Sequence, residues 1–81
     1  MEDNIIVLYN DNKLVIQTIG IISNGQLKVV DRNNQEHEHF SCEISNTDFI
    51  SAEANLPSGK LQVQIITTHK KMVKNIIINQ R

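Results

Sequence analysis

The segment Glu36-His37-Glu38-His39 holds two of the three histidines of the chain and is its most concentrated group of metal-ligand side chains. On an extended backbone, His37 and His39 would project from one face, whereas Glu36 and Glu38 would project from the other. A structural zinc site normally has four protein ligands, and two imidazoles fall short of that number. The sequence therefore favours a solvated turn that leads into an edge strand, and it predicts no metal site.

Cys42 is the single cysteine of the chain, and a nucleophilic role would need a nearby base such as His37 or His39. However, Cys42 shares its predicted strand face with Phe40 and Ile44, where a thiol packs as a small hydrophobic group with a raised pKa. The sequence contains no G-x-S-x-G motif, no H-E-x-x-H motif and no glycine-rich phosphate loop. We therefore expect no catalytic residue, no cofactor and no enzymatic activity.

The elements that would position these side chains are predicted to be strands. Isoleucine, valine and leucine supply most of the apolar residues, and β-branched side chains suit a pleated surface. Apolar and polar residues alternate in short runs, and no sustained helical periodicity is present. Seven strands are predicted, with Ile19–Ile22 as an extension of the second or as a bend: Ile5–Tyr9, Lys13–Thr18, Gln26–Val30, Glu38–Ile44, Asp48–Ala52, Lys60–Thr67 and Met72–Asn79.

Turn residues separate the predicted strands. Asn10-Asp11-Asn12 supplies side chains that tolerate a left-handed backbone, and Asn24-Gly25 is the strongest short hairpin signal in the chain. Ser45-Asn46-Thr47 is predicted to end the fourth strand. Short strands at this spacing predict an all-β fold, a small antiparallel immunoglobulin-like β-sandwich of about seven strands. Residues 1–81 are predicted to form a single domain with one modest core.

Charge is distributed unevenly along the chain. The net charge of −1 gives no general attraction for nucleic acid or for an anionic membrane. Residues 1–59 nevertheless hold three basic and nine acidic side chains, whereas residues 60–81 hold five basic side chains and no acidic one. The basic end is either a docking feature for a partner or an internal complement to acidic neighbouring strands. No aromatic side chain lies beside its lysines in the sequence, so we expect no nucleic-acid partner.

The sequence also bears on location. No apolar stretch approaches the ~20 residues of a membrane-spanning helix, so no membrane span is predicted. Met1-Glu2-Asp3-Asn4 is acidic where a signal peptide carries basic residues. The chain is then either an intracellular protein, cytoplasmic if Met1 is the native start, or a domain of a longer exported protein.

The segment Leu56-Pro57-Ser58-Gly59-Lys60-Leu61-Gln62-Val63-Gln64-Ile65 is a turn followed by a strand with alternating faces. Pro57 presets the turn, and Gly59 can adopt a positive φ. The segment resembles the L-P-x-G-x-Y-x-V-x-I motif of the C-terminal sorting domains that direct proteins through the type IX secretion system of Bacteroidetes. In order along the chain, other segments are similar to further strands of that family: Asn12–Ile16, Leu27–Gln35 and Lys71–Ile78.

The resemblance implies a noncatalytic sorting module that directs an attached cargo to the cell surface, with the secretion machinery as partner. It implies export to the periplasm and then to the surface. The residues expected to contact the partner are Pro57 and Gly59, which set the turn, and Lys70, Lys71 and Lys74, which present positive charge. Two alternatives are a generic immunoglobulin-like interaction module of a surface protein and a free-standing small binder or immunity protein.

The last predicted strand adds one further expectation. Its run Ile76-Ile77-Ile78 would be adhesive if it were left uncovered at the edge of a sheet. We therefore also predict that two copies of the chain can pair through their edge strands as a homodimer.

Overall fold

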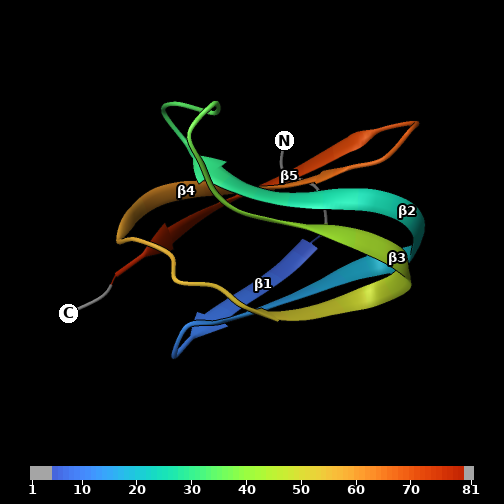
Figure 1. Ribbon diagram of the computed structural model, residues 1–81, viewed down its shortest axis with the longest axis horizontal. Helices are drawn as coiled ribbons and strands as arrows, with labels where there is room; N and C mark the ends of the chain where they lie inside the picture. The colour runs from blue at the N-terminus through green and yellow to red at the C-terminus, as the bar shows by residue number, and fades with distance from the viewer. Residues whose placement is uncertain (1–4, 80–81) are drawn as a thin grey trace.

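The computed structural model describes residues 5–79, which form an all-β fold with a single curled antiparallel sheet (Figure 1). The sheet order is β1-β2-β4-β5, and β3 also pairs with β2. The all-β prediction is confirmed, but these residues form five strands rather than seven, and all five belong to one hydrogen-bonded sheet. The strands are β1 (Ile5–Asn10), β2 (Lys13–Asp31), β3 (Glu38–Glu53), β4 (Gly59–Ile66) and β5 (Lys71–Ile78).

The strand β2 is long because it serves both halves of the sheet. Its first part lies between β1 and the end of β3, and its second part lies between β4 and the beginning of β3. Between these parts, residues 18–21 of β2 lie opposite the single residue Asp48 of β3. Such a large bulge bends a strand and increases its twist. The β2–β3 pair therefore curls over, so that the two halves of the sheet face each other (Figure 1).

The predicted hairpin at Asn24-Gly25 is wrong. Both residues lie within β2, where they pair with Ser45 and Ile44 of β3. Gly25 serves a different purpose, because a Cβ atom there would lie only 3.0 Å from the carbonyl oxygen of Ile66. Glycine at this position allows two backbones to approach each other in the curled sheet.

The predicted break at Ser45-Asn46-Thr47 is also wrong. The predicted strands Glu38–Ile44 and Asp48–Ala52 are parts of one continuous strand, β3. Asn46 has a φ of 53°, a left-handed conformation that asparagine tolerates better than most residues. Asn46 therefore does not end the strand, as the sequence predicted, but helps β3 to bend beside the bulge of β2.

Two other turn predictions are confirmed. Asp11 and Asn12 have φ values of 51° and 60°, and Asn10 pairs with Lys13, so a two-residue turn joins β1 to β2. Positive φ at both central residues is typical of the type I′ turn, whose twist matches that of the flanking strands. Gly59 likewise has a φ of 127°, in the positive region that the sequence predicted for it.

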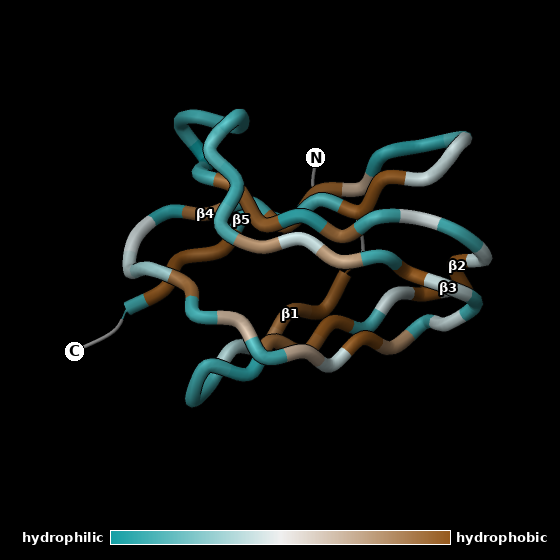
Figure 2. Tube along the Cα trace, in the orientation of Figure 1, coloured by the Kyte–Doolittle hydropathy of each residue, from teal (hydrophilic) through white to brown (hydrophobic). Residues whose placement is uncertain are grey.

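The core lies between the two facing halves of the sheet. Figure 2 shows hydrophobic residues along the strands and hydrophilic residues at the β1–β2 and β2–β3 turns. The side chains that are almost completely buried come from β2, from β4 and from the connection before β4: Leu14, Ile16, Leu27, Val29, Val30, Leu56, Leu61, Val63 and Ile65. Residues 5–79 include no helix with the length and apolar character of a membrane span.

The polar face of β4 differs from the expectation of a half-buried strand. Gln62 and Gln64 alternate with core residues, yet they are also buried, because β4 lies between β2 and β5. The Gln64 amide donates to Gln62 Oε1 at 2.8 Å, and the Gln62 amide donates to Asn75 Oδ1 at 3.1 Å. This chain of hydrogen bonds offsets the cost of burying the two amides.

Candidate functional site

The two most exposed large hydrophobic side chains of residues 5–79 lie together at the bulge of β2. Ile19 is 77% exposed and Ile21 is 65% exposed. They line a groove of about 720 Å³, hereafter the bend groove, which is bounded by residues 19–24 on one side and by Met72 and the β4–β5 turn on the other. Exposed apolar side chains gathered in one groove are typical of an interaction surface.

Hydrogen bonds fix the β2 wall of the bend groove. The buried Thr18 hydroxyl donates to the carbonyl oxygen of Gly20 at 2.7 Å. The side-chain amide of Gln17 donates to the carbonyl oxygen of Asp48 at 3.0 Å, which ties the bulge to β3. The side chains of Gln17 and Thr18 thus hold the backbone on the N-terminal side of Ile19 and Ile21.

The opposite wall is the tight turn between β4 and β5. The backbone N–H of Thr67 donates to the carbonyl oxygen of Lys70 at 2.9 Å. The Thr67 hydroxyl oxygen accepts hydrogen bonds from the backbone N–H groups of His69, at 3.3 Å, and Lys70, at 3.1 Å. This turn is therefore ordered, and it places Lys70 at the rim of the groove.

The groove has a positive rim. His69 and Lys70 are among the residues that line it, and no aspartate or glutamate is. Within residues 5–79, no ion pair joins Lys70 or Lys71 to an acidic side chain. Internal complementarity with acidic strands and docking of a partner therefore both stay predictions for the basic C-terminal region.

The five residues predicted to contact a partner do not form one site. Lys70 lines the bend groove, and the exposed Lys71 begins β5 beside it. Lys74 is half-buried, on the face of β5 that also carries Met72. Pro57 and Gly59 lie at the far end of β4, and an eight-residue strand spans about 23 Å. Lys70 and Lys71, which are adjacent in the sequence, therefore lie far from the Pro57–Gly59 turn.

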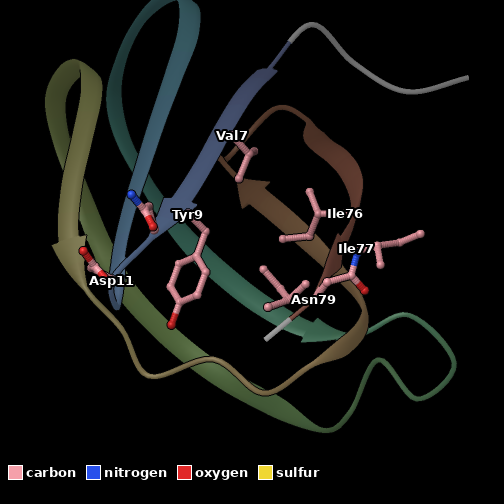
Figure 3. A pocket seen from close by; sticks show the side chains of 8 residues that line it. Val7, Tyr9, Asp11, Ile76, Ile77 and Asn79 are labelled. Carbon is pink, nitrogen blue, oxygen red and sulfur yellow. The ribbon is translucent and has the colours of Figure 1, made fainter. Parts of the chain in front are cut away.

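A second, smaller groove of about 240 Å³ lies between β1 and β5 (Figure 3). Val7, Tyr9 and Ile76 line it, but the Tyr9 hydroxyl is engaged in the structure. This hydroxyl donates to the carbonyl oxygen of Ala54 at 2.7 Å and accepts from the backbone N–H of Leu56 at 2.9 Å. Tyr9 thus anchors the connection before β4 to β1, a structural role that the sequence did not indicate.

The edge strand β5 bears on the predicted homodimer. Ile77 is 58% exposed, whereas Ile78 is buried and Ile76 packs partly against the core. Of the three side chains in the Ile76-Ile77-Ile78 run, only that of Ile77 is therefore largely exposed. The edge-strand homodimer stays a prediction.

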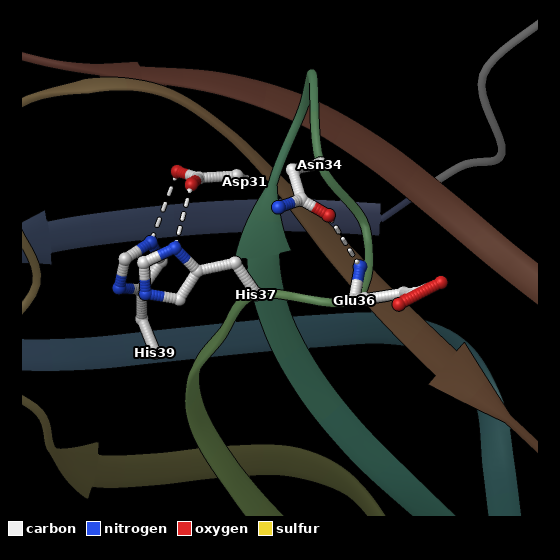
Figure 4. A network of polar contacts seen from close by, with 5 residues as sticks. All are labelled: Asp31, Asn34, Glu36, His37 and His39. Atoms are coloured by element: carbon white, nitrogen blue, oxygen red, sulfur yellow. Dashed lines mark hydrogen bonds and ion pairs between the residues drawn. The ribbon is translucent and has the colours of Figure 1, made fainter.

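The structure brings His37 and His39 together with a third group, Asp31 (Figure 4). His39 Nε2 lies 3.0 Å from Asp31 Oδ1, and His37 Nδ1 lies 3.2 Å from Asp31 Oδ2. The pKa of the Asp31 carboxyl lies below its ordinary value, mainly because His39 hydrogen-bonds to it, although partial burial opposes the shift. The sequence interpretation missed Asp31. The signal that could have found it is that Asp31 and His37 lie at the two ends of the connection between the predicted strands Gln26–Val30 and Glu38–Ile44.

Cys42 behaves as the sequence predicted. Its side chain packs against the core beside Phe40 and Ile44. Burial raises the pKa of the thiol, which keeps it protonated and weakly nucleophilic at neutral pH.

A scan of the chain against models of known protein families finds no match, and a search of curated proteins finds no similar sequence. The resemblance to type IX sorting domains therefore stays a prediction, which rests on the motifs quoted above.

Proposed function

We propose that this domain is a noncatalytic protein-interaction module that binds an extended segment of a partner, apolar and acidic in character, in the bend groove. The observation that carries this proposal is the position of Ile19 and Ile21. Both are exposed on an ordered backbone, and Lys70 lies across the groove from them. An apolar centre with a charged rim is the usual anatomy of a protein-binding surface.

The backbone at the bulge supports an extended occupant. Within residues 5–79, the register of β3 skips Ile19, Gly20 and Ile21. Extended peptides bind along strands through main-chain hydrogen bonds, while their side chains provide specificity. Its apolar side chains would pack on Ile19 and Ile21.

The charge of the rim favours an acidic partner. Lys70 lines the groove, is exposed and has no acidic partner within residues 5–79. Complementary charge at the rim of an interface speeds association and sets orientation more than it adds affinity. The partner segment is therefore expected to alternate carboxylate and aliphatic side chains.

A short synthetic peptide in which glutamate and isoleucine alternate provides the test. We expect it to shift the backbone NMR signals of residues 19–24 and 67–72 of the full chain. Replacing Ile21 by serine or Lys70 by glutamate is expected to weaken binding about fivefold or more, the equivalent of ~1 kcal/mol. The matched controls Ile6→Ser and Lys13→Glu change exposed residues that do not line the groove and should bind as the wild type does.

Three results would contradict the proposal. The first is that the peptide leaves residues 19–24 unshifted at millimolar concentration. The second is that the control variants lose as much affinity as Ile21→Ser and Lys70→Glu. The third is that a peptide with lysine in place of glutamate binds equally well, because the charge of Lys70 would then play no part.

The specific form of this function that the sequence favours is sorting of an attached cargo through a type IX-like secretion system. It is supported by the motif at Leu56–Ile65 and by the positive φ of Gly59 in the turn of that motif. An immunoglobulin-like β-sandwich is part of the same proposal, supported by two halves of an antiparallel sheet that enclose one core.

A reporter cargo tests the sorting proposal. With the domain at its C-terminus, the reporter is expected to reach the surface of a bacterium that has a type IX system, whereas the same reporter without the domain should stay in the periplasm. Protease accessibility on intact cells measures the difference. Equal surface exposure of both reporters would count against sorting, without bearing on peptide binding in the bend groove.

A further inference from the structure

The end of the β2–β3 hairpin gathers three metal-ligand side chains. The side-chain nitrogens of His37 and His39 and a carboxylate oxygen of Asp31 all lie within 4.8 Å of one another. Figure 4 shows both imidazole rings turned toward the two oxygens of Asp31. In a tetrahedral zinc site, bond lengths of about 2.1 Å place neighbouring ligand atoms about 3.4 Å apart. In the structure each imidazole nitrogen contacts a separate oxygen of Asp31, His39 Nε2 at 3.0 Å from Oδ1 and His37 Nδ1 at 3.2 Å from Oδ2, and a bound metal ion would replace these two contacts.

The backbone holds these three residues in place. Asp31 ends β2 and His39 lies near the beginning of β3, while His37 is tied between them. The backbone N–H of Asp31 donates to the carbonyl oxygen of His37 at 3.1 Å, and that of His37 donates to the carbonyl oxygen of Asn34 at 3.0 Å. The neighbouring residue Arg32 extends the pairing with β4 through its N–H to the carbonyl oxygen of Lys60. Ligands supported in this way lose little conformational entropy when a metal binds.

The types of ligand restrict which metal ion the site can bind. Two imidazole nitrogens and one carboxylate oxygen suit zinc and other divalent transition metals, whereas magnesium and calcium prefer all-oxygen sites with six or more ligands. The acidic neighbours do not complete the site. The Glu38 carboxylate forms an ion pair with Lys28, in which Oε1 lies 3.8 Å from Nζ. Figure 4 shows the carboxylate of Glu36 directed away from the imidazoles.

We propose that Asp31, His37 and His39 form a binding site for a divalent transition-metal ion, for which Zn²⁺ is the probe, with the remaining coordination positions open to water. The bound ion would join Asp31, the last residue of β2, to His37 and His39 at the beginning of β3. The sequence suggested too few ligands because Asp31 precedes His37 by six positions. The β2–β3 hairpin brings Asp31 beside the two histidines.

Zinc titration of the full chain, without a polyhistidine tag and in competition with a chromophoric chelator, tests this proposal. We expect one zinc ion per chain with a micromolar dissociation constant, and no detectable response to magnesium. His37→Ala and His39→Ala should each weaken zinc binding at least ~10-fold, since even the loss of an outer-shell partner has that effect. His37 is 59% exposed, so its removal should leave the fold intact, which circular dichroism checks.

The third histidine supplies the matched control. His69 lies in the β4–β5 turn, outside the cluster, so His69→Ala should bind zinc as the wild type does. The ring NMR signals of His37 and His39, but not those of His69, should shift on addition of zinc. Absence of micromolar zinc binding would overturn the proposal, and so would equal losses in the His37→Ala and His69→Ala variants.

Discussion

Replacing Leu14 by alanine is expected to lower the free energy of unfolding by about 2–5 kcal/mol. Leu14 is completely buried on β2, where it pairs with Tyr9 of β1 and Ala52 of β3. Truncation removes apolar surface from the core and leaves a cavity that the surrounding strands cannot fill without moving. Small domains are stable by only about 5–15 kcal/mol, so this single change removes a large part of the total. Denaturant unfolding measures it as a lower transition midpoint.

The matched control is Leu8→Ala. Leu8 lies on the neighbouring strand β1 and is 62% exposed, so the same chemical change should cost less than about 1 kcal/mol. The slope of the unfolding free energy against denaturant should be unchanged in both variants. Equal losses at Leu14 and Leu8 would contradict the arrangement in which the first part of β2 turns Leu14 into the core.

Replacing Gly25 by alanine is expected to destabilise the domain by about 1–3 kcal/mol, the usual cost of overpacking. The new methyl group would lie 3.0 Å from the carbonyl oxygen of Ile66 and 3.1 Å from a methyl group of Ile22. The first contact involves backbone, so relief requires β4 to move relative to β2. The entropy that alanine removes from the unfolded chain, about 0.4–1 kcal/mol, offsets part of this cost.

Gly20→Ala is the control for that experiment. Gly20 lies in the bulge of the same strand, with an ordinary φ and nothing within 4 Å of an added Cβ. Alanine there should be neutral or stabilising by up to ~1 kcal/mol. Thermal or denaturant unfolding of the two variants gives the comparison directly. A Gly25→Ala variant as stable as Gly20→Ala would show that β2 and β4 do not approach closely at this point.

The faces of the strands could be predicted from the sequence. In the predicted strands Lys13–Thr18, Gln26–Val30 and Lys60–Thr67, apolar residues recur at every second position, and these residues are buried in the core: Leu14, Ile16, Leu27, Val29, Leu61, Val63 and Ile65. The prediction succeeded because the alternation of side chains along a strand is a local property of the extended backbone. The turn at Asp11-Asn12 was predictable for a similar reason, since left-handed backbone is a preference of those residues themselves.

The connections between these faces could not be predicted in the same way. Asn24-Gly25 suits both a tight turn and a close contact between extended strands, and its own residues do not choose between them. The choice follows from pairing with β3, which lies about 20 residues further along the chain. The same pairing positions the bulge that exposes Ile19 and Ile21, and hence the bend groove.

The features of the candidate sites likewise separate into those set by local sequence and those set by pairing between distant segments. The sequence by itself determined that the chain folds as antiparallel strands, which side chains enter the core, that Cys42 packs there, and that positive charge gathers near the C-terminus. Only the tertiary structure decided that five strands form one curled sheet, that Lys70 and two exposed isoleucines line one groove, and that Asp31 contacts two histidines. The physical reason is that alternation and turn preference act over a few residues, whereas sheet register is fixed by hydrogen bonds and packing between segments far apart in the chain.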